Sequence, residues 1–121
     1  MKIAVCTSEK SPHATVCNRF GRAEYFAVYD TLSKDWQYYA NAQDTQAAQG
    51  AGIQSAQTII DSGAEVLVAA NVGPKAMRAL TANKVKVFAA AVTKTLTEQI
   101  ALYESGKLTE MTMANVEGHW V

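Results

Sequence analysis

Three nearly continuous apolar runs indicate strands that are buried on both faces of a sheet. They span residues 2–6, 65–70 and 85–90. Short apolar runs without alternation are typical of strands that helices cover on both sides. Two further runs, residues 25–29 and 36–39, are rich in aromatic and β-branched residues and flank a short polar turn, which predicts an antiparallel hairpin. The hydrophobic pattern therefore predicts five strands.

Three stretches with helical spacing of apolar residues lie between and after these strands. The first is expected to open at Gly50-Ala51-Gly52 and to end near Gly63. Its apolar stripe consists of Ile53, Ala56, Ile59 and Ile60. Pro74 begins the second helix, because its ring suits the first turn. Thr95 and Glu98 form a capping box that begins the third.

This order of elements, a hairpin followed by alternating strands and helices, predicts an α/β fold. Right-handed crossovers make the three buried strands parallel. We expect a mixed five-stranded sheet with the antiparallel aromatic hairpin at one edge and helices on both faces. No internal repeat or second domain is visible, so residues 1–121 are expected to form a single domain. The polar, alanine-rich residues 41–49 are expected to be a mobile connection.

The composition bounds the classes of function. The chain has 121 residues with 11 basic and 11 acidic side chains, so it offers no broad cationic surface for a nucleic acid backbone. The longest apolar run covers only a few residues, and the chain begins with a strand pattern, so we expect a cytoplasmic protein without a membrane partner. Two cysteines do not make a disulfide framework, and both are expected to be thiols in a reducing compartment.

The topology gathers three separate segments at one rim of the sheet. Ligands of such folds bind beyond the carboxyl ends of the parallel strands. In this chain, the rim holds Cys6 with the polar loop after it, Asn71-Val72-Gly73-Pro74, and the residues after Ala90. The amino end of the helix at Gly50-Ala51-Gly52 is a further candidate member of this rim.

Arg19-Phe20-Gly21-Arg22 in the first of these loops indicates an anion site, because two cations bracket a glycine. Backbone amides at the helix starts near Gly50 and Gly52, and at Asn71-Val72-Gly73-Pro74, also favour negative charge. Each feature has an ordinary alternative. The arginines could be solvated or pair with Glu24, and the glycines could serve close packing at a helix start.

Cys6, His13 and Cys17 are the candidate metal ligands. Thiolate and imidazole suit copper(I), zinc or iron–sulfur species, although the spacing is not a zinc signature. The alternative is an exposed loop histidine with incidental or buried thiols. A hydrolytic triad is not supported, because no serine lies at a nucleophile elbow and no carboxylate is placed behind a histidine.

Three motifs follow one another along the chain. They are Arg19-Phe20-Gly21-Arg22-Ala23 with Tyr25-Phe26, Gly50-Ala51-Gly52-Ile53-Gln54 with Ala56-Gln57, and Asn71-Val72-Gly73-Pro74 with Ala76 and Leu80. This set resembles the dinitrogenase iron–molybdenum cofactor biosynthesis family over residues 2–108, leaving residues 109–121 as a tail. The resemblance implies a ribonuclease H-like, three-layer fold. Members of the family include carriers of nitrogenase cofactor precursors and the orange proteins, which hold a molybdenum–copper sulfide cluster.

The resemblance implies a protein that binds, stores or transfers an anionic metal–sulfur cluster and is not an enzyme. The cluster would be a molybdenum–copper sulfide, as in the orange proteins, or an iron–molybdenum cofactor precursor, with Arg19, Arg22 and helix-start amides neutralising it without covalent ligands. Nuclease activity is not expected, because the strand ends lack the clustered carboxylates that hold two metal ions. The alternative is a regulatory module that binds a nucleotide or a partner ATPase.

The tail, residues 109–121, has its own apolar positions. They are Met111, Met113, Val116 and Trp120. We expect the tail to add an edge strand, cover the cleft or contact a partner such as a cluster acceptor protein. A loosely ordered terminus is the alternative. A further hypothesis is that Trp120, beside His119, closes over a bound cluster.

Overall fold

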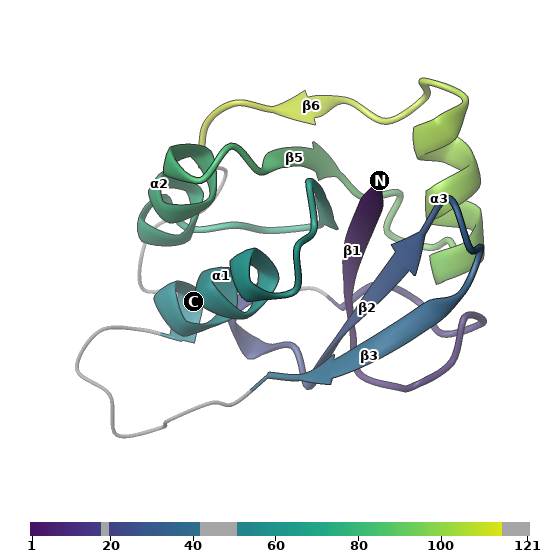
Figure 1. Ribbon diagram of the computed structural model, residues 1–121. Helices are drawn as coiled ribbons and strands as arrows, with labels where there is room; N and C mark the ends of the chain where they lie inside the picture. Colours follow the sequence, from purple (N-terminus) through teal and green to yellow (C-terminus); the bar gives the residue numbers. More distant parts are fainter. Residues whose placement is uncertain (18–19, 42–50, 115–121) are drawn as a thin grey trace.

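A six-stranded mixed sheet forms the centre of the molecule, whose computed structural model describes residues 1–17, 20–41 and 51–114 (Figure 1). The strands are β1 (Lys2–Thr7), β2 (Tyr25–Asp30), β3 (Trp36–Ala40), β4 (Val66–Ala69), β5 (Lys86–Ala89) and β6 (Glu110–Met111). Their order across the sheet is β3-β2-β1-β4-β5-β6. β1, β4 and β5 are parallel, and the other pairings are antiparallel. The predicted parallel centre with the aromatic hairpin β2–β3 at one edge is therefore confirmed.

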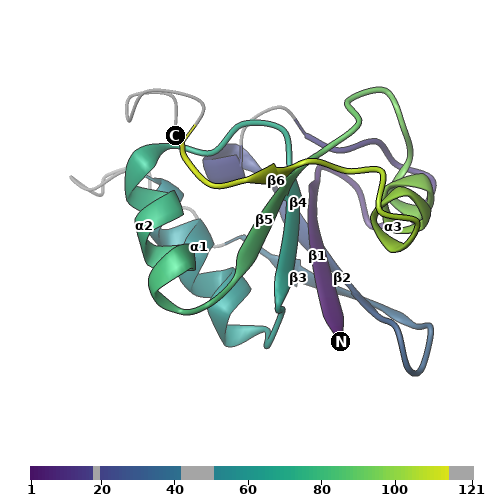
Figure 2. The same cartoon turned by 90° about the horizontal axis from the view of Figure 1, so that it is seen from above.

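Three helices within the described residues cover the two faces of this sheet (Figure 2). α1 (Ala51–Asp61) and α2 (Pro74–Ala82) pack against each other on one face, and α3 (Leu96–Glu104) covers the other. The rings of Phe88 on β5 and Tyr103 on α3 meet edge to face, with 5.0 Å between centroids. The predicted three-layer α/β fold with helices on both faces is confirmed. None of the described helices has the length and apolar character that a membrane span needs.

The central strands are buried on both faces, as their uninterrupted apolar sequence predicts. Consecutive residues of a strand point to opposite faces, and Ala4 and Val5 of β1, like Leu67 and Val68 of β4, have no exposed area. Each face therefore packs on a helix layer. This packing holds the carboxyl ends of β1 and β4 in fixed positions at the predicted rim.

The sheet has one strand more than the hydrophobic pattern predicts. β6 comes from the tail, where Met111 pairs with Val87 of β5 and the Thr109 carbonyl accepts from the Ala89 N–H at 2.8 Å. A strand of two residues gives no pattern signal, and it forms because the outer edge of β5 offers backbone groups for pairing. Of the three expectations for the tail, the described part therefore confirms the added edge strand. The candidates that lie outside the described residues are Val116, His119 and Trp120.

One residue of the predicted mobile connection is fixed in place. Asn41 directly follows β3 and exposes only 8% of its surface. Its N–H donates to the Glu24 carbonyl at 2.9 Å, and its side-chain amide is buried because it finds partners on two neighbouring segments. The expectation of mobility is therefore wrong for Asn41, while residues 42–49 lie outside the described residues.

The capping box predicted for the last helix is present. The Thr95 hydroxyl accepts from the Glu98 N–H at 3.2 Å, and the Glu98 carboxylate accepts from the Thr95 N–H at 3.0 Å. Thr95→Ala should lower the free energy of unfolding, measured in urea, by about 1 kcal/mol, because a helix-start amide loses its side-chain acceptor. Thr81→Ala at an exposed position of α2 is the control. Equal losses in both variants would contradict the capping role.

Candidate functional site

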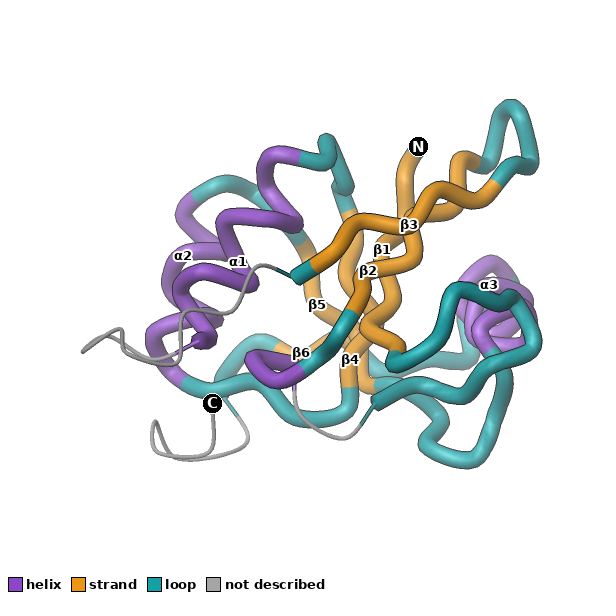
Figure 3. The backbone as a smooth tube through the Cα atoms, turned by 90° about the horizontal axis from the view of Figure 1, so that it is seen from below, coloured by secondary structure: helices purple, strands orange, loops and turns teal. Residues whose placement is uncertain are grey.

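The carboxyl ends of the parallel strands open at one rim of the sheet, and two of the predicted segments meet there (Figure 3). The loop after β1 reaches the loop after β4 through a hydrogen bond from the Phe20 N–H to the Asn71 carbonyl, at 3.2 Å. A second bond, from the Ala90 N–H to the Ala69 carbonyl at 3.0 Å, ties the end of β5 to β4. The structure therefore places Phe20 beside Asn71, as the topology predicts.

Phe20–Arg22 forms a single 3-10 turn, η1, that divides its residues between core and surface. Phe20 has no exposed area, and its ring packs on Phe26 of β2 with 5.3 Å between centroids. Gly21 is buried as well, whereas Arg22 is exposed. Phe20 thus anchors the turn, and Arg22 is the side chain of the turn that a ligand can reach. Arg19 lies outside the described residues.

A buried polar network holds η1 against α1. The side-chain amide of Asn41 donates to the Ala23 carbonyl at 2.8 Å and to the Ser55 hydroxyl at 2.9 Å. Ser55 on α1 has no exposed area, and its hydroxyl also lies within 3.5 Å of the Gly21 carbonyl. Sequence patterns do not reveal this pair, because Asn41 and Ser55 are 14 positions apart and neither belongs to a recognisable motif.

α2 begins at the rim with no side chain capping it. Pro74 occupies the first turn, as predicted, and the preceding Gly73 is buried. Gly73 has ordinary extended backbone angles, φ −79° and ψ 170°, so its conformation does not require a glycine. The positive end of the helix dipole therefore lies at the rim next to the loop that carries Asn71 and Val72. Such a position favours an anion.

The start of α3 offers less to an anion. At α3, the first amides already have acceptors in the Thr95 side chain and in the Ala14 carbonyl, which takes the Leu96 N–H at 2.9 Å. α1 carries Gly52 in its first turn, and Gly50 lies outside the described residues. Compared with α3, α2 therefore begins without a side-chain bond from its N-cap residue, and the loop before it is bonded to η1.

The third predicted segment, after β5, is shaped by Gln99 of α3. Gln99 has no exposed area. Its side chain accepts from the Ala91 N–H at 3.0 Å and donates to the carbonyls of Ala91, at 2.5 Å, and Lys94, at 3.3 Å. These bonds give the turn after β5 a fixed shape. Gln99 is a further residue that sequence patterns miss, because its partners are backbone groups that carry no sequence signal.

Cys6 and Cys17 lie opposite each other at the end of β1. Thr7 and Val16 form an antiparallel bridge, and the Cys17 N–H donates to the Cys6 carbonyl at 3.1 Å. The Cys6 thiol is fully buried and donates to the Cys17 carbonyl at 3.9 Å. A hydrogen bond with the Cys17 side chain, together with burial, raises the pKa of Cys6 well above its ordinary value. At neutral pH Cys6 is therefore predominantly a neutral thiol.

His13 does not complete a metal centre with these two cysteines. It is exposed in a turn where its N–H donates to the Ser11 hydroxyl at 3.2 Å. Across residues 1–17, 20–41 and 51–114, no three His, Cys, Asp or Glu side chains form a group that could hold a metal ion. Of the three predicted metal ligands, the structure therefore brings Cys6 and Cys17 together. The same described segments contain no acidic cluster of the kind that two-metal nuclease chemistry requires.

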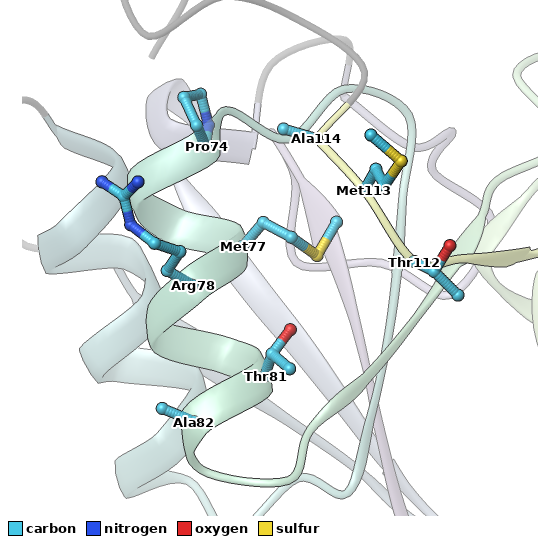
Figure 4. A pocket seen from close by; sticks show the side chains of 8 residues that line it. All are labelled: Pro74, Met77, Arg78, Thr81, Ala82, Thr112, Met113 and Ala114. Carbon is cyan, nitrogen blue, oxygen red and sulfur yellow. The ribbon is translucent and has the colours of Figure 1, made fainter.

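A cavity of about 660 Å³ lies between α2 and the residues that follow β6 (Figure 4). Its lining consists of Pro74, Met77, Arg78, Thr81, Ala82, Thr112, Met113 and Ala114. The Met77 side chain reaches from α2 toward Met113 across this groove. Of the predicted site residues that the structure describes, Pro74 is the one in this lining, so the described parts of the apolar groove and of the predicted anion site are neighbouring but different surfaces.

Comparison with known proteins places the chain in a family. The sequence matches the family described as dinitrogenase iron-molybdenum cofactor over residues 1–106. The apo form of the orange protein from Desulfovibrio gigas is 33% identical, with a TM-score of 0.89 over 95% of this chain and 96% of that chain. A Thermotoga protein described as a NifB protein of the DUF35 family is also 33% identical, with a TM-score of 0.80 over 97% and 98%. None of the curated proteins matches significantly. Because the family match and both identities span nearly the whole chain, this protein belongs to the dinitrogenase iron-molybdenum cofactor family.

Proposed function

We propose that this protein binds an anionic metal–sulfur cluster at the rim and stores or transfers it without catalysing a reaction. The observation that carries the proposal is the hydrogen bond from the Phe20 N–H to the Asn71 carbonyl, which joins the arginine-bearing turn to the loop that leads into the start of α2. Arg22 is exposed on that turn, and the helix dipole adds partial positive charge. An open, positively charged rim suits an anion that is larger than a phosphate.

Charge and hydrogen bonds, rather than protein thiolates, are proposed to hold the cluster. Cys6 is protonated because its pKa is raised, and coordination would first have to remove that proton. Arg19, Arg22 and the backbone amides of residues 50–52 and 71–73 would instead neutralise the cluster. Release from such a site breaks no coordination bond, which suits a carrier.

The family supports this class of cargo. Its description names an iron-molybdenum cofactor, which makes a precursor of that cofactor one candidate. The similarity to the orange protein, with a TM-score of 0.89, favours a molybdenum–copper sulfide as the other. A cytoplasmic acceptor protein or ATPase is the proposed partner in transfer.

Reconstitution with tetrathiomolybdate and copper tests the proposal. We expect the protein to become coloured, with sulfide-to-metal absorption bands that migrate with it through a size-exclusion column. Protein kept unfolded in urea should take up no colour, which distinguishes a folded site from attack on exposed thiols. A colourless folded protein, together with metal-free protein from the native host, would overturn the proposal. Binding of ATP without cluster uptake would favour a regulatory nucleotide-binding module instead.

A further inference from the structure

Cys6 and Cys17 face each other across a short antiparallel pairing at the end of β1. The bridge between Thr7 and Val16 sets an antiparallel register in which the neighbouring residues, Cys6 and Cys17, face each other. Directly opposite residues of an antiparallel pair have Cα atoms about 4.5–5.5 Å apart. A disulfide usually joins Cα atoms about 4.4–6.8 Å apart. The register therefore satisfies the main geometric requirement.

The two side chains also lie on the same side of this pairing. The Cys6 thiol donates to the Cys17 carbonyl oxygen at 3.9 Å, and the Cys17 side chain is close enough to be the main cause of the raised pKa of Cys6. Both residues are thiols in the structure. They differ in access, because Cys6 has no exposed area whereas Cys17 is half-buried. A small reagent can therefore reach Cys17 first.

We propose that Cys6 and Cys17 form a reversible intrachain disulfide by exchange with a small-molecule disulfide. The Cys17 thiol loses its proton to water, and its thiolate attacks one sulfur of the reagent, which releases one thiolate and leaves a mixed disulfide on Cys17. The Cys6 thiol then loses its proton and attacks the Cys17 sulfur, which releases the second thiolate. The protein loses two hydrogens and gains one S–S bond, and the reagent is reduced to two thiols.

This bond would tether the segment leading into η1. Cys17 lies three positions before Phe20, so the disulfide would link the approach to that turn covalently to the end of β1. The assignment goes beyond the proposed cluster binding and does not depend on it. It makes the end of β1 a site of reversible oxidation.

Titration of the reduced full-length protein with oxidised and reduced glutathione tests this assignment. Remaining thiols are alkylated at each ratio, and intact mass and peptide mapping follow the products. The expected oxidised product is a monomer that has lost two hydrogens, takes up no alkylating reagent and yields a linked peptide pair containing Cys6 and Cys17. Added dithiothreitol should restore both thiols.

Two variants separate the steps of the exchange. Cys6→Ala should stop at a stable glutathione adduct on Cys17, and Cys17→Ser should leave Cys6 unmodified because Cys6 is buried. The wild-type result does not depend on the folding of either variant. Wild-type protein that keeps both thiols at every glutathione ratio, forms only intermolecular disulfides, or stops at the adduct on Cys17 would overturn the assignment.

Discussion

Asn41→Ala is expected to lower the free energy of unfolding by about 2–3 kcal/mol. The Asn41 amide donates to the Ala23 carbonyl at 2.8 Å and to the Ser55 hydroxyl at 2.9 Å from a position that is only 8% exposed. The variant removes these two hydrogen bonds where water has little access, and a hydrogen bond typically contributes about 0.5–1.5 kcal/mol to stability. The lost side-chain volume adds to the cost. Urea denaturation followed by circular dichroism measures the change.

Asn83→Ala is the matched control. Asn83 also donates its side-chain amide to a carbonyl, that of Ala79 at 2.9 Å, but it is exposed at the end of α2, where water can replace the bond. Asn83→Ala should lower the free energy of unfolding by less than about 0.5 kcal/mol. A double-mutant cycle of Asn41→Ala with Ser55→Ala should give a coupling energy of about 1 kcal/mol, because the two side chains bond to each other. Strictly additive losses would contradict a linked network.

The framework of the fold follows from signals that the sequence carries locally. Apolar runs mark β1 and β4 because helices cover both faces of these strands, whereas the run of β5 contains the exposed Lys86 and only Val87 of that strand is buried. Pro74 and the Thr95 capping box mark helix starts because the chemistry of a helix start involves neighbouring residues. β6 carries no such signal, since two residues join the sheet through backbone pairing that almost any sequence can provide.

α1 shows where periodicity describes a buried face incompletely. Ala56 and Ile59 of its predicted stripe have no exposed area, yet Ile53 is 38% exposed whereas Ser55 has no exposed area. The buried face includes Ser55 because Asn41, just after β3, provides a partner for its hydroxyl. A hydrophobic pattern cannot reveal this partner, because a distant segment supplies it. The same limit applies to Gln99, whose buried amide bonds to the turn after β5.

The candidate site likewise has features that the sequence predicts and features that it does not. The topology predicts that the loops after β1 and β4 converge, and the bond between Phe20 and Asn71 confirms that they are neighbours. The role of each residue within a loop is less predictable. Phe20 belongs to the motif that suggests an anion site, but it is a core residue, because a motif does not specify which side chain of a turn faces inward. The proposed electrostatic role consequently centres on the arginines of that motif.

Arg19→Ala combined with Arg22→Ala should raise the dissociation constant of the reconstituted cluster by about 10- to 100-fold. Hydrogen bonds from a guanidinium to an anion are about twice as strong as neutral ones, and the loss of about 1.4 kcal/mol weakens binding tenfold. The double variant should also show a shallower dependence of binding on salt, because fewer charges are left to screen. Arg22 is exposed, so Arg22→Ala alone should weaken binding without a change in the unfolding midpoint.

The control is Lys84→Ala combined with Lys86→Ala, which removes the same number of positive charges. Lys84 precedes β5 and Lys86 begins it, and both are exposed at the amino end of the sheet, opposite the rim, where they line a pocket together with Met1. If the whole-molecule charge attracted the cluster, both double variants would lose affinity equally. If the rim holds it, the lysine variant should stay within about twofold of wild type, since more than a Debye length of about 8–10 Å separates exposed charges at that end from the rim. Equal dissociation constants for the arginine variant and wild type would show that the arginines do not bind the cluster.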